Sequence, residues 1–303
     1  MWFIVATAAF LLLAIASVID KFLLTKTKIV PVSFAFYIAA FAGIFGSLLI
    51  FFDRSFYLPY DLLGVLILGG AALFFGLYFM FLAVARAEVS KTSPIIVSLT
   101  PVSVFFLSLI LGLELVSYFK IIGIIIVIVA GYWLSQVGQT KNRLKVSTWL
   151  LVILASLLMG ASNVYSKIAY DNLSFISAFV WLRWTCLAAA LLFVSLSFQW
   201  HKILLKDKSA KKTAPIKSAV KIMIIGQVAG SLGVVLLQLA IKLGNVILVT
   251  ALNGLQFFFV IYLVYLLSRF SPKILKEDIN RRYVWQKIVL SAAMVVGVVL
   301  VLI

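Results

Sequence analysis

The chain has 303 residues, of which 65% are hydrophobic and only 12% are charged, and its mean hydropathy is +1.21. A soluble globular protein is roughly 45–50% apolar, so this composition excludes an ordinary soluble domain. The net charge is +17, but the cations lie between apolar runs, without the interleaved aromatic residues that binding of single-stranded nucleic acid requires. We therefore expect a protein embedded in the lipid bilayer whose basic loops contact anionic headgroups, with no nucleic acid partner.

Long apolar runs follow one another along the whole chain. In lipid, each run of about 20 residues must satisfy its own backbone hydrogen bonds, which an α-helix does. The first run lacks a basic segment before it and a good cleavage site after it, so we interpret it as a span and not a signal peptide. The sequence predicts ten spans, at residues 2–23, 30–52, 62–85, 93–113, 119–137, 147–168, 173–198, 218–241, 246–268 and 285–303.

The basic residues alternate between the two sides of these spans. The loops after the first, third, fifth, seventh and ninth spans carry 21 of the 26 Lys and Arg residues, four lie on the other side, and Arg183 lies within a span. Positive residues are enriched in cytoplasmic loops. We therefore expect a multi-pass protein of the cell membrane, with the odd-numbered loops in the cytoplasm and both termini outside.

Short stretches in the two halves of the chain match in the same order. Residues 17–21 match residues 163–167, and Gly69 and Gly76 recur at a constant offset as Gly226 and Gly233. Five spans in each half make residues 1–140 and 147–303 two repeats, and an odd number of crossings inserts the second repeat in the opposite direction. Inverted repeats are typical of secondary transporters, with a substrate site near the membrane midplane. Chance similarity between apolar helices is the competing interpretation.

The same stretches resemble the EamA branch of the drug/metabolite transporter superfamily. The resemblance is carried by residues 82–90, Pro94, Pro101 and residues 111–114 in the first half, and by residues 239–256 and 272–277 in the second. It implies ten helices in two inverted five-helix repeats around a central cavity, and transport by alternating access. Two features depart from the family: many members have both termini in the cytoplasm, and Ala251 and Phe258 stand where the proline pair would recur.

Arg183 is the sharpest single signal for a site. It lies near the middle of the seventh predicted span, between Trp181 and Trp184. A charge at that depth costs at least about 2.5–3.5 kcal/mol on insertion scales, so it requires a partner or a wet cavity. One interpretation is a cationic anchor for a carboxylate or phosphate, with Trp181 closing over the ligand. The other is a structural arginine that binds helix carbonyls.

Other polar and proline residues within spans are candidates to line the cavity. Pro94 and Pro101 share roughly one helix face, and each frees a carbonyl in the preceding turn, beside Ser98. Amide side chains in lipid seek partners, so hydrogen bonding between helices is the competing interpretation for each of them. The remaining candidates are Tyr78, Asn163, Gln227, Asn253 and Gln256.

Two acidic residues at span ends are candidates for ion coupling. Asp20 adjoins Lys21, with which an interfacial pair is the simpler account, and Glu114 closes the fourth span. No carboxylate falls at the middle of a span, so exchange or facilitated transport is at least as well supported as a proton relay.

A secondary transporter of a small polar or anionic metabolite accounts best for these features. A flippase for a lipid or a lipid-linked sugar is the alternative, and differs in substrate and lateral access. A membrane-embedded enzyme would require His, Cys or paired carboxylates on facing helices, whereas the chain has one His, in a loop, and one Cys. We therefore expect no enzymatic activity, no metal site and no cofactor, and we make no prediction of the oligomeric state.

Overall fold

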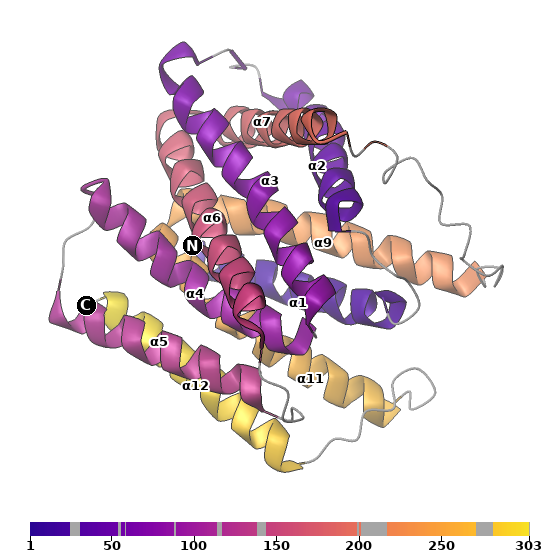
Figure 1. The fold of residues 1–303 in the computed structure, drawn as a ribbon, viewed down its shortest axis with the longest axis vertical. Coiled ribbons are helices and arrows are strands. Elements are labelled where there is room, and N and C mark those ends of the chain that lie inside the picture. Colours follow the sequence, from indigo (N-terminus) through magenta and orange to yellow (C-terminus); the bar gives the residue numbers. More distant parts are fainter. Residues whose placement is uncertain are drawn as a thin grey trace.

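The computed structural model describes residues 1–24, 31–53, 56–57, 59–87, 89–113, 117–137, 144–198, 200, 217–270 and 281–302. Every regular element in these ranges is helical (Figure 1). Within them, five helical segments are long and apolar enough to cross a membrane: Trp2–Ile19, Pro31–Phe52, Tyr60–Arg86, Val146–Asn172 and Phe175–Leu196. The prediction of an all-α membrane protein is confirmed.

The helices lie within a few residues of the ranges predicted for them. The first half contains α1 (Trp2–Leu24), α2 (Pro31–Ser47) with the 3₁₀ helix η1 (Leu48–Phe52), η2 (Tyr60–Leu62) leading into α3 (Leu63–Arg86), α4 (Val89–Ile110) and α5 (Tyr118–Gln136). The second half contains α6 (Val146–Asn172), α7 (Phe175–Leu196), α9 (Lys217–Leu243), α10 (Val246–Ala251), α11 (Gly254–Phe270) and α12 (Arg281–Leu302).

The range 246–268, predicted as one span, is interrupted. Helix α10 ends at Ala251, and α11 begins at Gly254. The turn between them is tightened by hydrogen bonds across three residues: Leu255 N donates to Leu252 O at 2.8 Å, and Gln256 N donates to Asn253 O at 3.1 Å. Asparagine and glycine are weak helix formers, which accounts for the position of the break.

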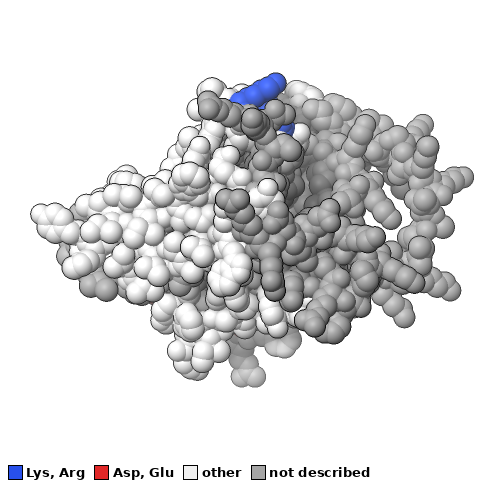
Figure 2. Space-filling model, turned by 90° about the horizontal axis from the view of Figure 1, so that it is seen from below, with Lys and Arg blue, Asp and Glu red and all other residues white. Residues whose placement is uncertain are grey.

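The helices pair across the two halves of the chain. The most extensive contacts are those of α3 with α6, of α1 with α9 and of α5 with α12. Helices α5 and α12 lie side by side at one edge of the bundle (Figure 1). Their outer faces carry exposed apolar side chains such as Ile122 and Ile125 on α5 and Val289 on α12. On the face shown in Figure 2, the described residues are uncharged apart from a basic patch at one edge, as a lipid-facing surface requires.

Buried apolar clusters lie at both ends of the bundle. The Asn172 end, where α6 and α9 finish and α7 and α10 begin, holds the largest of the described clusters, to which α1, α3, α4, α5, α6, α7, α9 and α10 contribute. The Arg86 end, where α3 finishes and α4 and α6 begin, holds a cluster from α3, α4 and α6.

Glycine lets α3 and α7 meet backbone to backbone. A Cβ added at Gly70 would lie 2.5 Å from the backbone nitrogen of Cys186. In the same contact the Thr185 hydroxyl donates to Leu66 O at 2.8 Å, so the two helices are also hydrogen-bonded. In lipid, association of helices depends on such close packing and such bonds.

Substitution of Gly70 tests this packing. Gly70→Ala is expected to lower the free energy of unfolding by about 1–3 kcal/mol, because backbone atoms of α7 occupy the space of the new methyl group. Gly64→Ala in the same helix is the matched control, since its Cβ meets nothing within 4 Å. The measurement is the thermal unfolding midpoint in detergent. Equal midpoints for the two variants would contradict the close contact.

Candidate functional site

Arg183 is buried between helices. Its side chain is 7% exposed, and its Cζ lies 4.8 Å from the centroid of the Phe179 ring, one turn earlier in α7. The guanidinium Nε is buried without a hydrogen-bond partner, and Arg183 forms no ion pair with any described carboxylate. The guanidinium therefore has one face against an aromatic ring and a polar edge that no side chain satisfies.

Small residues of α2 make room for this arginine. A Cβ added at Gly46 would lie 3.8 Å from both Cβ and Cγ of Arg183, and one added at Gly43 would lie 3.7 Å from the Arg183 carbonyl oxygen. Because neither glycine has a side chain, α2 approaches α7 directly at this level. The aliphatic part of the arginine is held in the interface between the first and second halves of the chain.

A second buried polar group lies near Arg183. The Tyr170 hydroxyl of α6 donates to Gln238 Oε1 of α9 at 3.0 Å, and both side chains are buried. Tyr170 is joined to Arg183 through a row of rings: the Tyr170 and Phe175 centroids are 5.4 Å apart, those of Phe175 and Phe179 are 5.8 Å apart, and the Arg183 Cζ lies over the Phe179 ring. Since tyrosine and glutamine satisfy each other, they leave the guanidinium edge free.

Trp181 and Trp184 hold the segment that follows α2. The Trp181 ring stacks on Phe56 with centroids 5.8 Å apart, and its Nε1 donates to Tyr57 O at 3.0 Å. The Trp184 Nε1 donates to Ser47 Oγ at 2.8 Å. Both indole N–H groups therefore bind protein acceptors. Closure of Trp181 over a ligand stays a prediction.

An acidic group caps α7. The Ser177 hydroxyl donates to Asp53 Oδ2 at 2.7 Å, and the Ser174 hydroxyl also donates to this oxygen. Ser174 is the N-cap residue, and its Oγ accepts from Ser177 N at 3.1 Å. A carboxylate near the first turn is also favoured by the helix dipole. Sequence reasoning treated Asp53 as a loop residue, although a serine directly before an apolar run is a recognisable capping signal.

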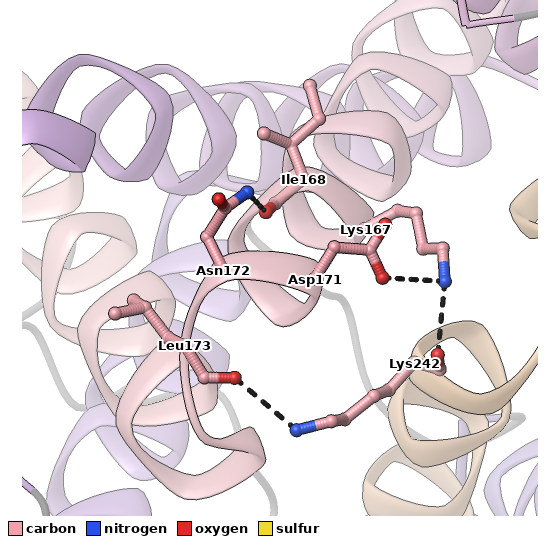
Figure 3. Close-up of polar contacts among 6 residues, drawn as sticks. All are labelled: Lys167, Ile168, Asp171, Asn172, Leu173 and Lys242. Carbon is pink, nitrogen blue, oxygen red and sulfur yellow. Dashed lines mark hydrogen bonds and ion pairs between the residues drawn. The ribbon is translucent and has the colours of Figure 1, made fainter.

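Two lysines join the ends of α6 and α9 (Figure 3). Lys167 Nζ pairs with Asp171 Oδ1 at 2.8 Å and donates to the Lys242 carbonyl at 3.0 Å. Lys242 Nζ donates to the Leu173 carbonyl at 3.3 Å. Positive groups at the carbonyl ends of helices compensate the helix dipole, so this lysine cluster stabilises the ends of α6 and α9.

The first-half candidates lie apart from Arg183 in contacts of their own. The Ser98 hydroxyl donates to Ile95 O at 2.9 Å, and the residue packs so closely on Gly131 of α5 that a Cβ there would overlap it. Pro101 is buried in α4. Tyr78 packs against Phe74 and Phe193, with centroids 6.5 and 5.0 Å away. Ser98 and Tyr78 therefore contribute to helix packing.

The second-half candidates divide similarly. Gln256 Nε2 donates to Ser17 Oγ at 3.1 Å and so links α11 to α1. Asn253 is half-buried in the break between α10 and α11, and Asn163 is half-buried in α6. Four further candidate residues lie outside the described residues or side chains: Pro94, Gln227, Asp20 and Glu114.

No protein-family model and no curated protein matches the chain. Among solved structures, a protein of known crystal structure aligns with 98% of this chain and 94% of its own, with a TM-score of 0.63 and 15% sequence identity. The chain is thus similar in fold, over nearly its whole length, to a protein of known structure.

Removal of the α7 cap tests the contact with Asp53. Ser174→Ala is expected to lower the free energy of unfolding by about 1 kcal/mol, because the first turn loses its side-chain acceptor and Asp53 loses a donor. Ser195→Ala, at an exposed serine near the other end of α7, is the control. Thermal unfolding in detergent measures both. A larger loss in the control than in Ser174→Ala would contradict the assignment.

Proposed function

We propose that the chain is a secondary transporter of the EamA type. In this proposal ten helical crossings form two inverted five-helix repeats, residues 1–140 and 147–303, which move a small polar or anionic metabolite by alternating access. The observation that carries the proposal is a set of glycine contacts that recurs in the two halves.

In the first contact, glycines of α3 pack on α6. A Cβ added at Gly69 would lie 3.1 Å from the Cβ of Tyr165. One added at Gly76, two turns later, would lie 3.2 Å from the backbone nitrogen of Met159. The two helices, one from each half, therefore cross closely over at least two turns.

In the second contact, glycines of α9 pack on α1. A Cβ added at Gly226 would lie 2.6 Å from Cγ2 of Ile19, and one added at Gly233 would lie 2.9 Å from Cγ of Leu13. These glycines are the sequence counterparts of Gly69 and Gly76.

The residues against which these glycines pack also correspond between the two halves. The match of residues 17–21 with 163–167 aligns Ile19 with Tyr165, and the same offset aligns Leu13 with Met159. Each half thus inserts its third helix against the first helix of the other half, at equivalent positions. A correspondence that holds in sequence and in three-dimensional contact together supports repeats over chance similarity between apolar helices.

The direction of the repeats follows from the number of crossings. With five spans in each half, the second repeat would enter the membrane from the opposite side, and the 21 basic residues on one side support a cytoplasmic location for that side. The Asn172 end then faces outward, and the Arg86 end faces the cytoplasm.

Two features support alternating access. At the Asn172 end, one buried cluster joins helices of both halves. The interruption at Asn253 adds a broken helix, a feature that secondary transporters use to present backbone groups to substrate.

Labelling of single cysteines tests the inverted topology. In a Cys186→Ala background, Tyr60→Cys and Leu196→Cys place exposed thiols at equivalent loops of the two halves; the native residues are 75% and 79% exposed. Because five crossings separate them, an impermeant maleimide is expected to label Tyr60→Cys on intact cells and Leu196→Cys only after permeabilisation. Labelling of both positions from one face would exclude an odd number of crossings.

Counterflow in proteoliposomes tests transport itself. Purified protein is expected to exchange at least one labelled solute from a panel of amino acids, monocarboxylates and sugars, with a rate that saturates and that requires the same solute inside. Vesicles with heat-unfolded protein are the control. Movement of a labelled phospholipid between leaflets, with no solute exchange, would favour the flippase instead.

A further inference from the structure

We propose that Arg183 binds a substrate group with a single negative charge, namely a carboxylate, and that doubly charged phosphates and dicarboxylates are poor substrates. The inference rests on the proposed transport function and deepens it, because it assigns the class of substrate group that Arg183 binds.

The unpartnered guanidinium edge is the first step. Arg183 is 7% exposed, and its Nε has no acceptor. Arginine binds carboxylates through two parallel N–H donors, and Nε with a neighbouring terminal nitrogen forms one such pair. An unsatisfied charged donor in the interior is costly, so its retention indicates an acceptor that is present during part of the functional cycle.

The neighbouring groups do not supply that acceptor. Phe179 covers the flat face of the guanidinium at 4.8 Å, a contact that leaves the donors at its edge unused. Tyr170 donates to Gln238 Oε1, and Ser47 Oγ accepts from Trp184 Nε1. The Gln238 and Ser47 oxygens are therefore already in hydrogen bonds.

Charge balance gives the number of charges on the ligand. Among the described side chains, the carboxylates of Asp53, Asp61 and Asp171 lie at helix ends or in loops, and none pairs with Arg183. The other described cations lie at or near helix ends, where Lys167 and Lys242 bind backbone carbonyls. A monoanion therefore neutralises Arg183, whereas a dianion leaves one negative charge that Arg183 does not compensate at low dielectric.

The experiment measures ligand binding to purified protein as a shift of the thermal midpoint in detergent. The probes are monocarboxylates and zwitterionic amino acids, their uncharged amides, dicarboxylates and inorganic phosphate. Ligands that bind the folded state raise the midpoint. Wild type is expected to respond to at least one monoanionic carboxylate and not to its amide or to phosphate. A response to phosphate or dicarboxylates alone, or to no carboxylate at all, would overturn the assignment.

Variants then assign the effect to Arg183. Arg183→Gln is expected to weaken binding about 10- to 100-fold, and Arg183→Lys by about tenfold, because lysine keeps the charge but loses the paired donors. Arg86→Gln, which removes an exposed arginine at the end of α3, is the matched control and should change binding less than twofold.

A stability measurement separates binding from a structural role. Without ligand, Arg183→Met is expected to melt at or above the wild-type temperature, because it removes a buried charge that has no partner. A lower midpoint for Arg183→Met, or unchanged carboxylate binding by Arg183→Gln, would overturn the inference. If both wild type and Arg183→Gln show counterflow of an uncharged solute, the inference about Arg183 fails, whereas the proposed transport function stands. Absence of all counterflow would instead count against transport.

Discussion

Close approach of helix backbones is the constraint on which this structure depends. Lipid is as apolar as a leucine side chain, so helices in a bilayer gain little from hiding apolar surface and associate through packing and hydrogen bonds. At Gly70 the backbone of α7 fills the space of a missing side chain, and at Gly226 a methyl group of Ile19 does so for α9. Hydrogen bonds between described side chains of different helices, such as Tyr170 to Gln238 and Gln256 to Ser17, add to this packing.

The sequence predicted the helices well and their mutual contacts only in part. Long apolar runs report a helix directly, because lipid permits little else, and so the ranges from α1 to α12 were close to those observed. The break at Asn253 was not predicted: Asn253 and Gly254 are weak helix formers, but the apolar run continues on both sides of them. The sequence match between Gly69 and Gly226 was visible beforehand. The residues against which each glycine packs became evident only in the structure.

The candidate site shows the same division. A mid-span arginine is conspicuous in sequence, so Arg183 was identified, whereas Asp53 and Ser174 meet only because η1 brings residues 121 positions apart together. Sequence spacing likewise could not tell Ser98, which packs on α5, from a cavity residue. The orientation of Trp181 depends on Phe56 and Tyr57, whose segment carries no strong local signal. Residue type predicted which side chains are candidates. The packing and hydrogen bonds of each side chain depend on residues far apart in sequence.

Helices of the two halves pack in pairs, and this pairing affects how the two ends of the bundle would open and close in turn under the proposed mechanism. Because α3 is packed on α6 and α1 on α9, each pair contains one helix from each half and would move as a unit. The lysine cluster and the large buried cluster join the two halves at the Asn172 end, so under the proposed mechanism opening there would require these contacts to part. Arg183 lies in the α2–α7 contact, which joins the two halves without belonging to either pair. An anion that neutralises the arginine lowers the cost of burying this charge in both states, and therefore in the passage between them.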